Sequence, residues 1–160
     1  MRHDPEVDLG SAAIPPLGPV LDFMRVVWAF DHALQRRSKH METTLGITAP
    51  QRLAIRVLGR FPGMQAGQLA KVLHLHPGTL SGILKRLERR GLISRRADPR
   101  DRRCAAVGLT AAGRTFNVEA EGTVEAAMQA TFDRLDEAKI KTTAEVLGLL
   151  TDSLGGAAAG

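Results

Sequence analysis

Arginine and lysine side chains gather in one stretch of this 160-residue chain. Residues 85–103 hold nine basic and three acidic side chains, whereas residues 104–160 hold four basic and eight acidic ones. The excess charge of that single stretch is larger than the net charge of the whole chain, which is +5. A localised basic block is typical of a surface that binds a polyanion, although an arginine-rich helix end that only faces solvent has the same composition.

The residue types that perform catalysis or bind metal ions are not arranged for either task. The sequence has no nucleophile beside a base, no paired carboxylates and no glycine-rich phosphate loop, so we expect no enzyme. The single cysteine, Cys104, excludes a disulfide framework, and we interpret it as a small core residue rather than a redox sensor. His74 and His76 lack a third ligand nearby in sequence, so a turn and a helix cap explain them better than zinc does. We therefore expect neither a metal ion nor another cofactor.

A helix that begins at Pro77 and ends before Gly91 has one face suited to DNA. Its apolar side chains follow the helical spacing i, i+3, i+4 and i+7 and form a narrow inward stripe: Leu80, Ile83, Leu84 and Leu87. The other face carries small residues first and basic residues last: Pro77, Gly78, Thr79, Ser81, Gly82, Lys85 and Arg86. Small residues allow a close approach to base edges in a major groove about 12 Å wide, and the basic side chains can reach guanine acceptors or phosphates.

The segments around this helix are predicted to support it. Thr48 is the expected N-cap of a helix that ends at Pro62-Gly63, and its predicted apolar face is Leu53, Val57, Leu58 and Phe61. A short helix over 65–73, with Leu69, Val72 and Leu73 inward, and a short turn come next. Residues 92–96 and 104–109 have the length of strands, and the charged segment 97–103 between them favours a turn. A helix, a turn, a second helix and a basic hairpin make a winged helix-turn-helix.

The two ends of the chain are predicted to be helical and apolar-striped. One helix runs over about 19–42 and carries Trp28, and a helical region over 111–154 has a break between Asp133 and Lys139. We therefore predict a mainly α fold with a small β-hairpin wing. A winged helix over about 48–110 lies between dimerisation helices, with a flexible arm at 1–18 and a disordered tail at 155–160. No apolar run reaches the roughly 20 residues of a membrane span, and no hydrophobic segment opens the chain, so we expect a cytoplasmic protein.

Residues 68–113 closely resemble the multiple antibiotic resistance regulator (MarR) family of bacterial transcription factors. The matching segments occur in the family's order and spacing: Gln68-Leu69-Ala70, Pro77-Gly78-Thr79-Leu80-Ser81, Leu84-Lys85-Arg86-Leu87-Glu88, Arg90-Gly91-Leu92-Ile93-Ser94-Arg95, Asp98-Pro99-Arg100-Asp101-Arg102-Arg103 and Leu109-Thr110-Ala111-Ala112-Gly113. Three positions depart from the commonest pattern: His76 at the usual Ser, Thr or Asp cap, Gly82 where a longer side chain often reads DNA, and Gly108, which is expected to break the second wing strand.

The resemblance implies a homodimer that binds a pseudo-palindromic operator, usually as a repressor. In the wing, Arg100, Arg102 and Arg103 are the expected DNA-binding residues, while Asp98 and Asp101 shape the turn and Asp98 pairs with Arg103. The alternative is a winged-helix module whose basic wing binds an acidic protein partner. Family members commonly respond to a small aromatic or phenolic anion. Here the residues that could line its pocket are Trp28, Asp31 and His32 from the first helix and some of Arg52, Arg56 and Phe61 from the second. A packed dimer-helix core explains the first three equally well.

Overall fold

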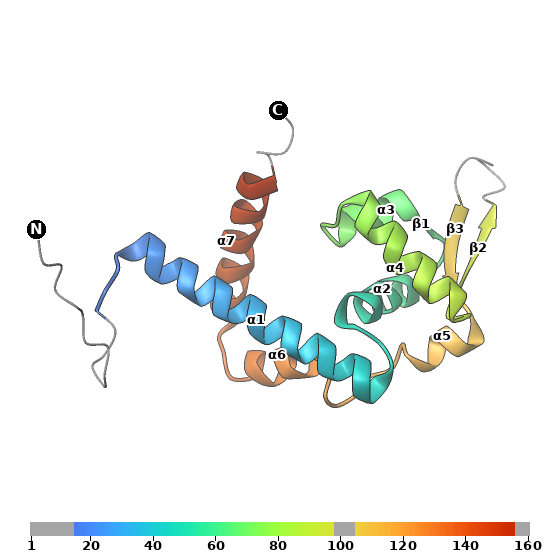
Figure 1. The fold of residues 1–160 in the computed structure, drawn as a ribbon, viewed down its shortest axis with the longest axis horizontal. Coiled ribbons are helices and arrows are strands. Elements are labelled where there is room, and N and C mark those ends of the chain that lie inside the picture. The colour runs from blue at the N-terminus through green and yellow to red at the C-terminus, as the bar shows by residue number, and fades with distance from the viewer. Residues whose placement is uncertain (1–14, 98–104, 156–160) are drawn as a thin grey trace, which may run out of the picture. The chain divides into compact units, whose positions relative to one another are not determined.

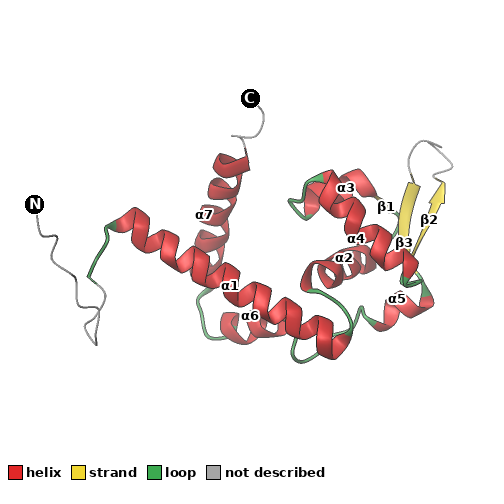
Figure 2. Ribbon diagram, in the orientation of Figure 1, coloured by secondary structure: helices red, strands yellow, loops and turns green. Residues whose placement is uncertain are grey.

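The computed structural model describes residues 15–97 and 105–155, which form seven helices and three short strands (Figure 2). Their bounds are α1 Pro19–Leu45, α2 Ala49–Arg60, β1 Met64–Gln65, α3 Ala66–Val72, α4 Pro77–Arg89, β2 Ile93–Ala97, β3 Ala105–Leu109, α5 Ala111–Thr115, α6 Val124–Phe132 and α7 Glu137–Gly155. The chain divides within α1 into two compact units, residues 1–36 and 37–160, and each is described by itself. The helices of residues 15–97 and 105–155 include none with the length and apolar character that a membrane span needs.

Local capping signals place the starts of α2, α4 and α5 as the sequence predicts. Thr48 accepts a hydrogen bond from the N–H of Gln51, whose side chain accepts one from the N–H of Thr48 in return. This reciprocal pair satisfies two N–H groups that a helix start otherwise leaves free. Pro77 opens α4, and Thr110 and Thr123 cap α5 and α6 through their hydroxyl oxygens.

The three strands form one antiparallel sheet in the order β1-β3-β2. β2 and β3 pair from Ile93 opposite Leu109 to Ala97 opposite Ala105, which confirms the predicted hairpin. The expectation that Gly108 breaks the second strand is wrong, because Gly108 lies in the ladder opposite Ser94. The two-residue strand β1 was not expected and pairs with β3 next to Val107, which is fully buried. The sheet therefore ties the start of α3 to the wing.

The core of the second unit lies among α2, α3, α4 and the sheet. Its buried side chains include Ile55 and Leu58 of α2, Leu69 of α3 and the whole predicted stripe of α4. The predicted apolar face of α2 is wrong at Leu53 and Phe61, which are 53% and 51% exposed, and the inward position expected for Val72 is 49% exposed. The core side of α2 also carries the buried polar residues Gln51 and Arg52. Because these two residues are polar, the hydrophobic pattern of the sequence does not identify this side as the buried one.

The C-terminal region has one more break than the sequence indicates. α5 ends at Thr115, and a connector of residues 116–123 leads to α6. The predicted break after Asp133 is confirmed, since α6 ends at Phe132 and α7 begins at Glu137. α7 extends to Gly155, so the predicted tail of 155–160 is wrong at its first residue. Residues 1–14 of the predicted arm and residues 156–160 of the predicted tail lie outside the described residues, as do residues 98–104.

Candidate nucleic-acid interface

α3 and α4 form the helix-turn-helix pair, and the β2–β3 hairpin follows α4 (Figure 1). Three backbone hydrogen bonds hold the turn between α3 and α4: Leu73 N–H to Leu69 O at 2.9 Å, His74 N–H to Lys71 O at 3.2 Å and Leu75 N–H to Ala70 O at 2.9 Å. His74 adopts a left-handed conformation with φ of 50°. Such a conformation is uncommon outside glycine but less so for histidine, which supports the assignment of His74 to a turn.

His76 caps the N-terminus of α4. Its Nδ1 atom accepts a hydrogen bond from the N–H of Gly78 at 3.1 Å. An acceptor at Nδ1 leaves the proton of a neutral imidazole on Nε2. The imidazole ring thus replaces the usual Ser, Thr or Asp as the N-cap. Its Nε2–H remains a hydrogen-bond donor at the start of the helix.

The faces of α4 are sorted as the sequence predicts. The stripe of Leu80, Ile83, Leu84 and Leu87 is at most 3% exposed. On the outer side, the residues Pro77, Gly78, Thr79, Lys85 and Arg86 are exposed, whereas Ser81 and Gly82 are half-exposed. A Cβ atom at Gly82 would have no heavy atom within 4 Å, so the helix surface is open there. Every predicted contact residue of α4 is accessible to a ligand outside the unit.

An ion pair that the sequence analysis missed ties α4 to the wing. Nε of Arg95 in β2 lies 3.3 Å from a carboxylate oxygen of Glu88 in α4. Glu88 is the one acidic residue of α4. Arg95 offsets its negative charge on a surface that otherwise carries Lys85, Arg86 and Arg89. The hairpin tip, with Asp98, Arg100, Asp101, Arg102 and Arg103, lies outside the described residues, as does Cys104. The roles of these residues stay predictions.

The chain resembles known transcriptional regulators in sequence. A model of the MarR family matches residues 47–105. An HTH-type transcriptional repressor of Mycobacterium tuberculosis is 32% identical over 107 residues, which are 65% of this chain and 77% of the repressor. The chain belongs to the MarR family. MarR family proteins are DNA-binding transcriptional regulators without enzymatic activity, which confirms the winged-helix regulator and the absence of catalysis expected from the sequence.

Two solved structures share the MarR fold of this chain. Sco3205 of Streptomyces coelicolor, solved in complex with DNA, has a TM-score of 0.72 at 24% identity. The match covers 88% of this chain and 94% of the Sco3205 chain. PcaV of Streptomyces coelicolor, solved with its natural ligand, has a TM-score of 0.67 at 20% identity and covers 89% of this chain and 99% of its own.

The residues predicted to line a ligand pocket fall in both units of this MarR protein. Trp28, Asp31 and His32 lie on α1 in the first unit, and all three are exposed. Arg56 and Phe61 lie in the second unit, where they border one cavity of about 460 Å³ together with Val57, Gly59, Arg60 and Asn117. Arg52 is 3% exposed, and all three of its guanidinium nitrogens bind acceptors of the protein itself. Arg52 is therefore not available to an anion.

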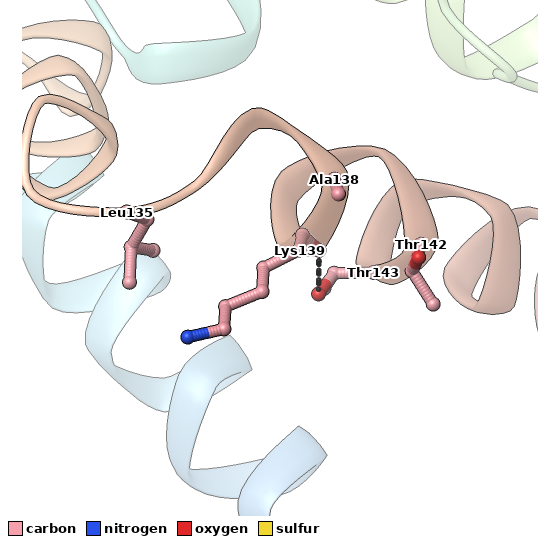
Figure 3. Close-up of a pocket in the computed structure, with 5 residues that line it drawn as sticks. All are labelled: Leu135, Ala138, Lys139, Thr142 and Thr143. Atoms are coloured by element: carbon pink, nitrogen blue, oxygen red, sulfur yellow. Dashed lines mark hydrogen bonds between the residues drawn. The ribbon is translucent and has the colours of Figure 1, made fainter.

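A second hollow lies where α6 turns into α7 (Figure 3). It is bordered by Leu135, Ala138, Lys139, Thr142 and Thr143. The hydroxyl of Thr143 donates to the carbonyl oxygen of Lys139 at 2.8 Å, and Nζ of Lys139 lies 3.5 Å from a carboxylate oxygen of Asp136. Lys139 and Thr143 are thus engaged with neighbouring groups at the start of α7.

Proposed function

We propose that this MarR family protein is a homodimeric repressor that reads a pseudo-palindromic operator with α4 and the wing, and that a small aromatic anion releases it. The observation that carries the DNA-binding part is the outer face of α4. Small and hydroxyl side chains stand at its N-terminal end and basic side chains at its C-terminal end, above a fully buried stripe. A helix of this kind presents its N-terminal residues to base edges in the major groove.

Binding to two kinds of duplex separates base contacts from phosphate contacts. We would select the preferred duplex from a random pool with the whole protein and compare it with an unrelated duplex. Alanine at Thr79, Ser81, Lys85 or Arg86 should cost about 1–3 kcal/mol on the selected duplex for a lost base contact and less on the unrelated one. Lys141→Ala on α7 is the matched control. Equal losses on both duplexes would assign the helix to phosphates only, and no binding at low salt would favour the acidic-protein alternative.

The wing is proposed to add affinity that does not depend on sequence. A dimer brings two wings and two recognition helices to the duplex, so about 6–10 phosphate contacts and a steep salt dependence are expected. Arg102→Ala should weaken binding to all duplexes and reduce the slope of log affinity against log salt. Arg134→Ala, which removes one arginine after α6, serves as the control. An unchanged slope in Arg102→Ala would place the wing away from DNA.

Homodimerisation is supported by apolar side chains that face solvent in each unit. On α1, Val20 and Trp28 are 71% and 61% exposed, and on α7, Leu149 and Leu154 are 69% and 78% exposed. Several other large apolar side chains of the same two helices are also exposed, and such grouping on one element is more typical of a partner surface than of a monomer. Sedimentation should give a dimer for the intact chain and a monomer for the double variant Leu149→Glu, Leu154→Glu, with Thr142→Glu as the control. A stable monomer for the intact chain would overturn the proposal.

The proposed inducer site is the cavity at the C-terminal end of α2. Arg60 offers a guanidinium group there, Arg56 offers the nitrogens other than the Nη1 that binds Asn117, and the exposed side chain of Phe61 offers an apolar surface. A benzoate- or phenolate-like ligand pairs its anion with arginine and buries its ring. Salicylate should weaken DNA binding in the intact chain, and Arg60→Met or Phe61→Ala should reduce that response, whereas Arg134→Met should not. Trp28 fluorescence during the same titration tests whether Trp28, Asp31 and His32 take part. No change in either signal at millimolar salicylate would contradict this site.

A further inference from the structure

Arg52 is an arginine buried inside the second unit with a full set of partners. Its side chain is 3% exposed, and its three nitrogens bind three different acceptors. Nε pairs with a carboxylate oxygen of Glu125, Nη1 donates to the carbonyl oxygen of Phe116 at 2.9 Å, and Nη2 donates to that of Val118 at 2.5 Å. These acceptors lie between 64 and 73 residues further along the chain. We call these four residues the Arg52 joint.

The Arg52 joint connects two helix ends. Phe116 is the C-cap of α5, and Glu125 lies in the first turn of α6. A positive group is favourable beside the carbonyl end of a helix, and a negative group is favourable in the first turn of one. Thr123, the N-cap of α6, is 1% exposed, and its hydroxyl donates to the carbonyl oxygen of Ala120 at 2.7 Å. The corner between α5 and α6 is thus fixed to α2 by charge and by hydrogen bonds together.

The same face of α2 holds the connector at a second place, one turn further on. Nη1 of Arg56 donates to the backbone oxygen of Asn117 at 2.9 Å and to its side-chain oxygen at 3.3 Å. A Cβ atom at Gly59 would overlap the amide group of Asn117, so the connector lies close against α2 there. α2 in turn packs into the core beneath α4 through Ile55 and Leu58. A chain of direct contacts therefore runs from the recognition helix to the start of α6.

We propose that Arg52 is a positioning residue that sets the half-site spacing of the operator. The joint fixes the direction in which α6 leaves the winged helix. α6 leads to α7, which is part of the proposed dimer surface, so in a homodimer this direction sets the separation of the two α4 helices. The inference rests on the proposed homodimer. One base pair added between half-sites moves one of them by about 3.4 Å and rotates it by about 35°, so a rigid joint cannot follow the change. A joint without its ion pair can bend to follow it.

The experiment measures the spacing preference of the whole protein. The duplex selected by the intact protein is remade with one or two base pairs added or removed at its centre, and affinities are measured at fixed salt. The intact protein should bind the original spacing best. Glu125→Ala should lower the ratio between the best and the altered spacings by about tenfold, which corresponds to about 1.4 kcal/mol. Glu125→Asp, which keeps the charge, should restore part of the ratio. Glu121→Ala removes an exposed carboxylate of the same connector and should leave the ratio unchanged.

Sedimentation and unfolding measurements accompany each variant. A folded, dimeric Glu125→Ala protein that keeps the original ratio overturns the role of the joint, as does one that loses affinity equally at every spacing. If Glu125→Ala does not fold, Glu125→Gln keeps an oxygen acceptor for Arg52 without the charge, and an original ratio in that variant overturns the role instead. An intact protein without any spacing preference overturns the proposed two-half-site dimer itself, which is a different result from either of these.

Discussion

Gly113 lies directly against the carbonyl group of Leu92. A Cβ atom at Gly113 would overlap the carbonyl oxygen of Leu92 and lie 2.9 Å from its carbonyl carbon. The carbonyl oxygen of Leu92 also accepts a hydrogen bond from the N–H of Thr110 at 3.1 Å. The hydroxyl of Thr110 donates to the carbonyl oxygen of Gly91 at 2.6 Å. The start of α5 is thereby locked to the segment between α4 and the wing. Glycine at this position is required by a backbone contact and not by a left-handed conformation, because Gly113 lies within α5 and has no positive φ.

The first prediction follows from this contact. Gly113→Ala should lower the free energy of unfolding by about 1–3 kcal/mol, because backbone atoms of Leu92 must shift to admit a methyl group. Urea unfolding followed by circular dichroism measures this. Gly148→Ala is the control, because a Cβ at Gly148 in α7 meets no atom within 4 Å. That variant should gain up to about 1 kcal/mol from helix propensity alone. A Gly113→Ala protein as stable as the original would show that the contact is not close.

The second prediction concerns the corrected core face of α2. Leu58 is 1% exposed and Leu53 is 53% exposed. Leu58→Ala should destabilise the protein by about 2–5 kcal/mol through lost burial and a residual cavity, whereas Leu53→Ala should stay within about 0.5 kcal/mol. Thermal unfolding of the two single variants at one protein concentration compares them directly. A larger loss at Leu53 than at Leu58 would mean that Leu53 is buried in the assembled protein.

Local patterns predict α4 well, because all its signals lie within 16 residues, from His76 to Gly91. The proline at its first position, the histidine cap, the apolar spacing and the glycine at position 91, with φ of 67°, act on neighbours in sequence. Strand β1 gives no such signal. Two residues are too few for a period-two pattern, and they become a strand only because Val107 and Ala106 of β3 lie opposite.

The candidate interface can be predicted from local sequence, whereas the Arg52 joint depends on residues far apart in the chain. The outer face of α4 follows from its inner face, since an amphipathic helix that buries one side presents the other. Arg52 gives no sequence signal, because two of its partners are backbone oxygens and the third, Glu125, lies 73 residues away. Because a charged residue usually marks the exposed face of a helix, Arg52 leads the hydrophobic pattern to assign the wrong face of α2 to the core.

The third prediction concerns the cap of the recognition helix. His76→Ala should destabilise the protein by about 1 kcal/mol, because the N–H of Gly78 loses its acceptor. His76→Ser should recover that stability, since serine is a strong N-cap. The two variants together separate the cap from any contact of Nε2 with DNA. If His76→Ser restores stability but not affinity for the selected duplex, the imidazole contacts DNA. Unfolding that is unchanged in His76→Ala would contradict the capping role.

The last prediction concerns Gly82, which lies on the outer face of α4 between Gly78 and Lys85. A Cβ there would meet no atom of the protein, so Gly82→Ala should raise the free energy of unfolding by about 0.5–1 kcal/mol. If glycine allows the helix to approach base edges, the same methyl group should weaken binding to the selected duplex more than to an unrelated one. Gly67→Ala in α3, where a Cβ is equally free, controls for helix propensity. A Gly82→Ala protein that is more stable and binds both duplexes as before would show that the DNA does not come close at this position, and that longer side chains could be placed there to change operator preference.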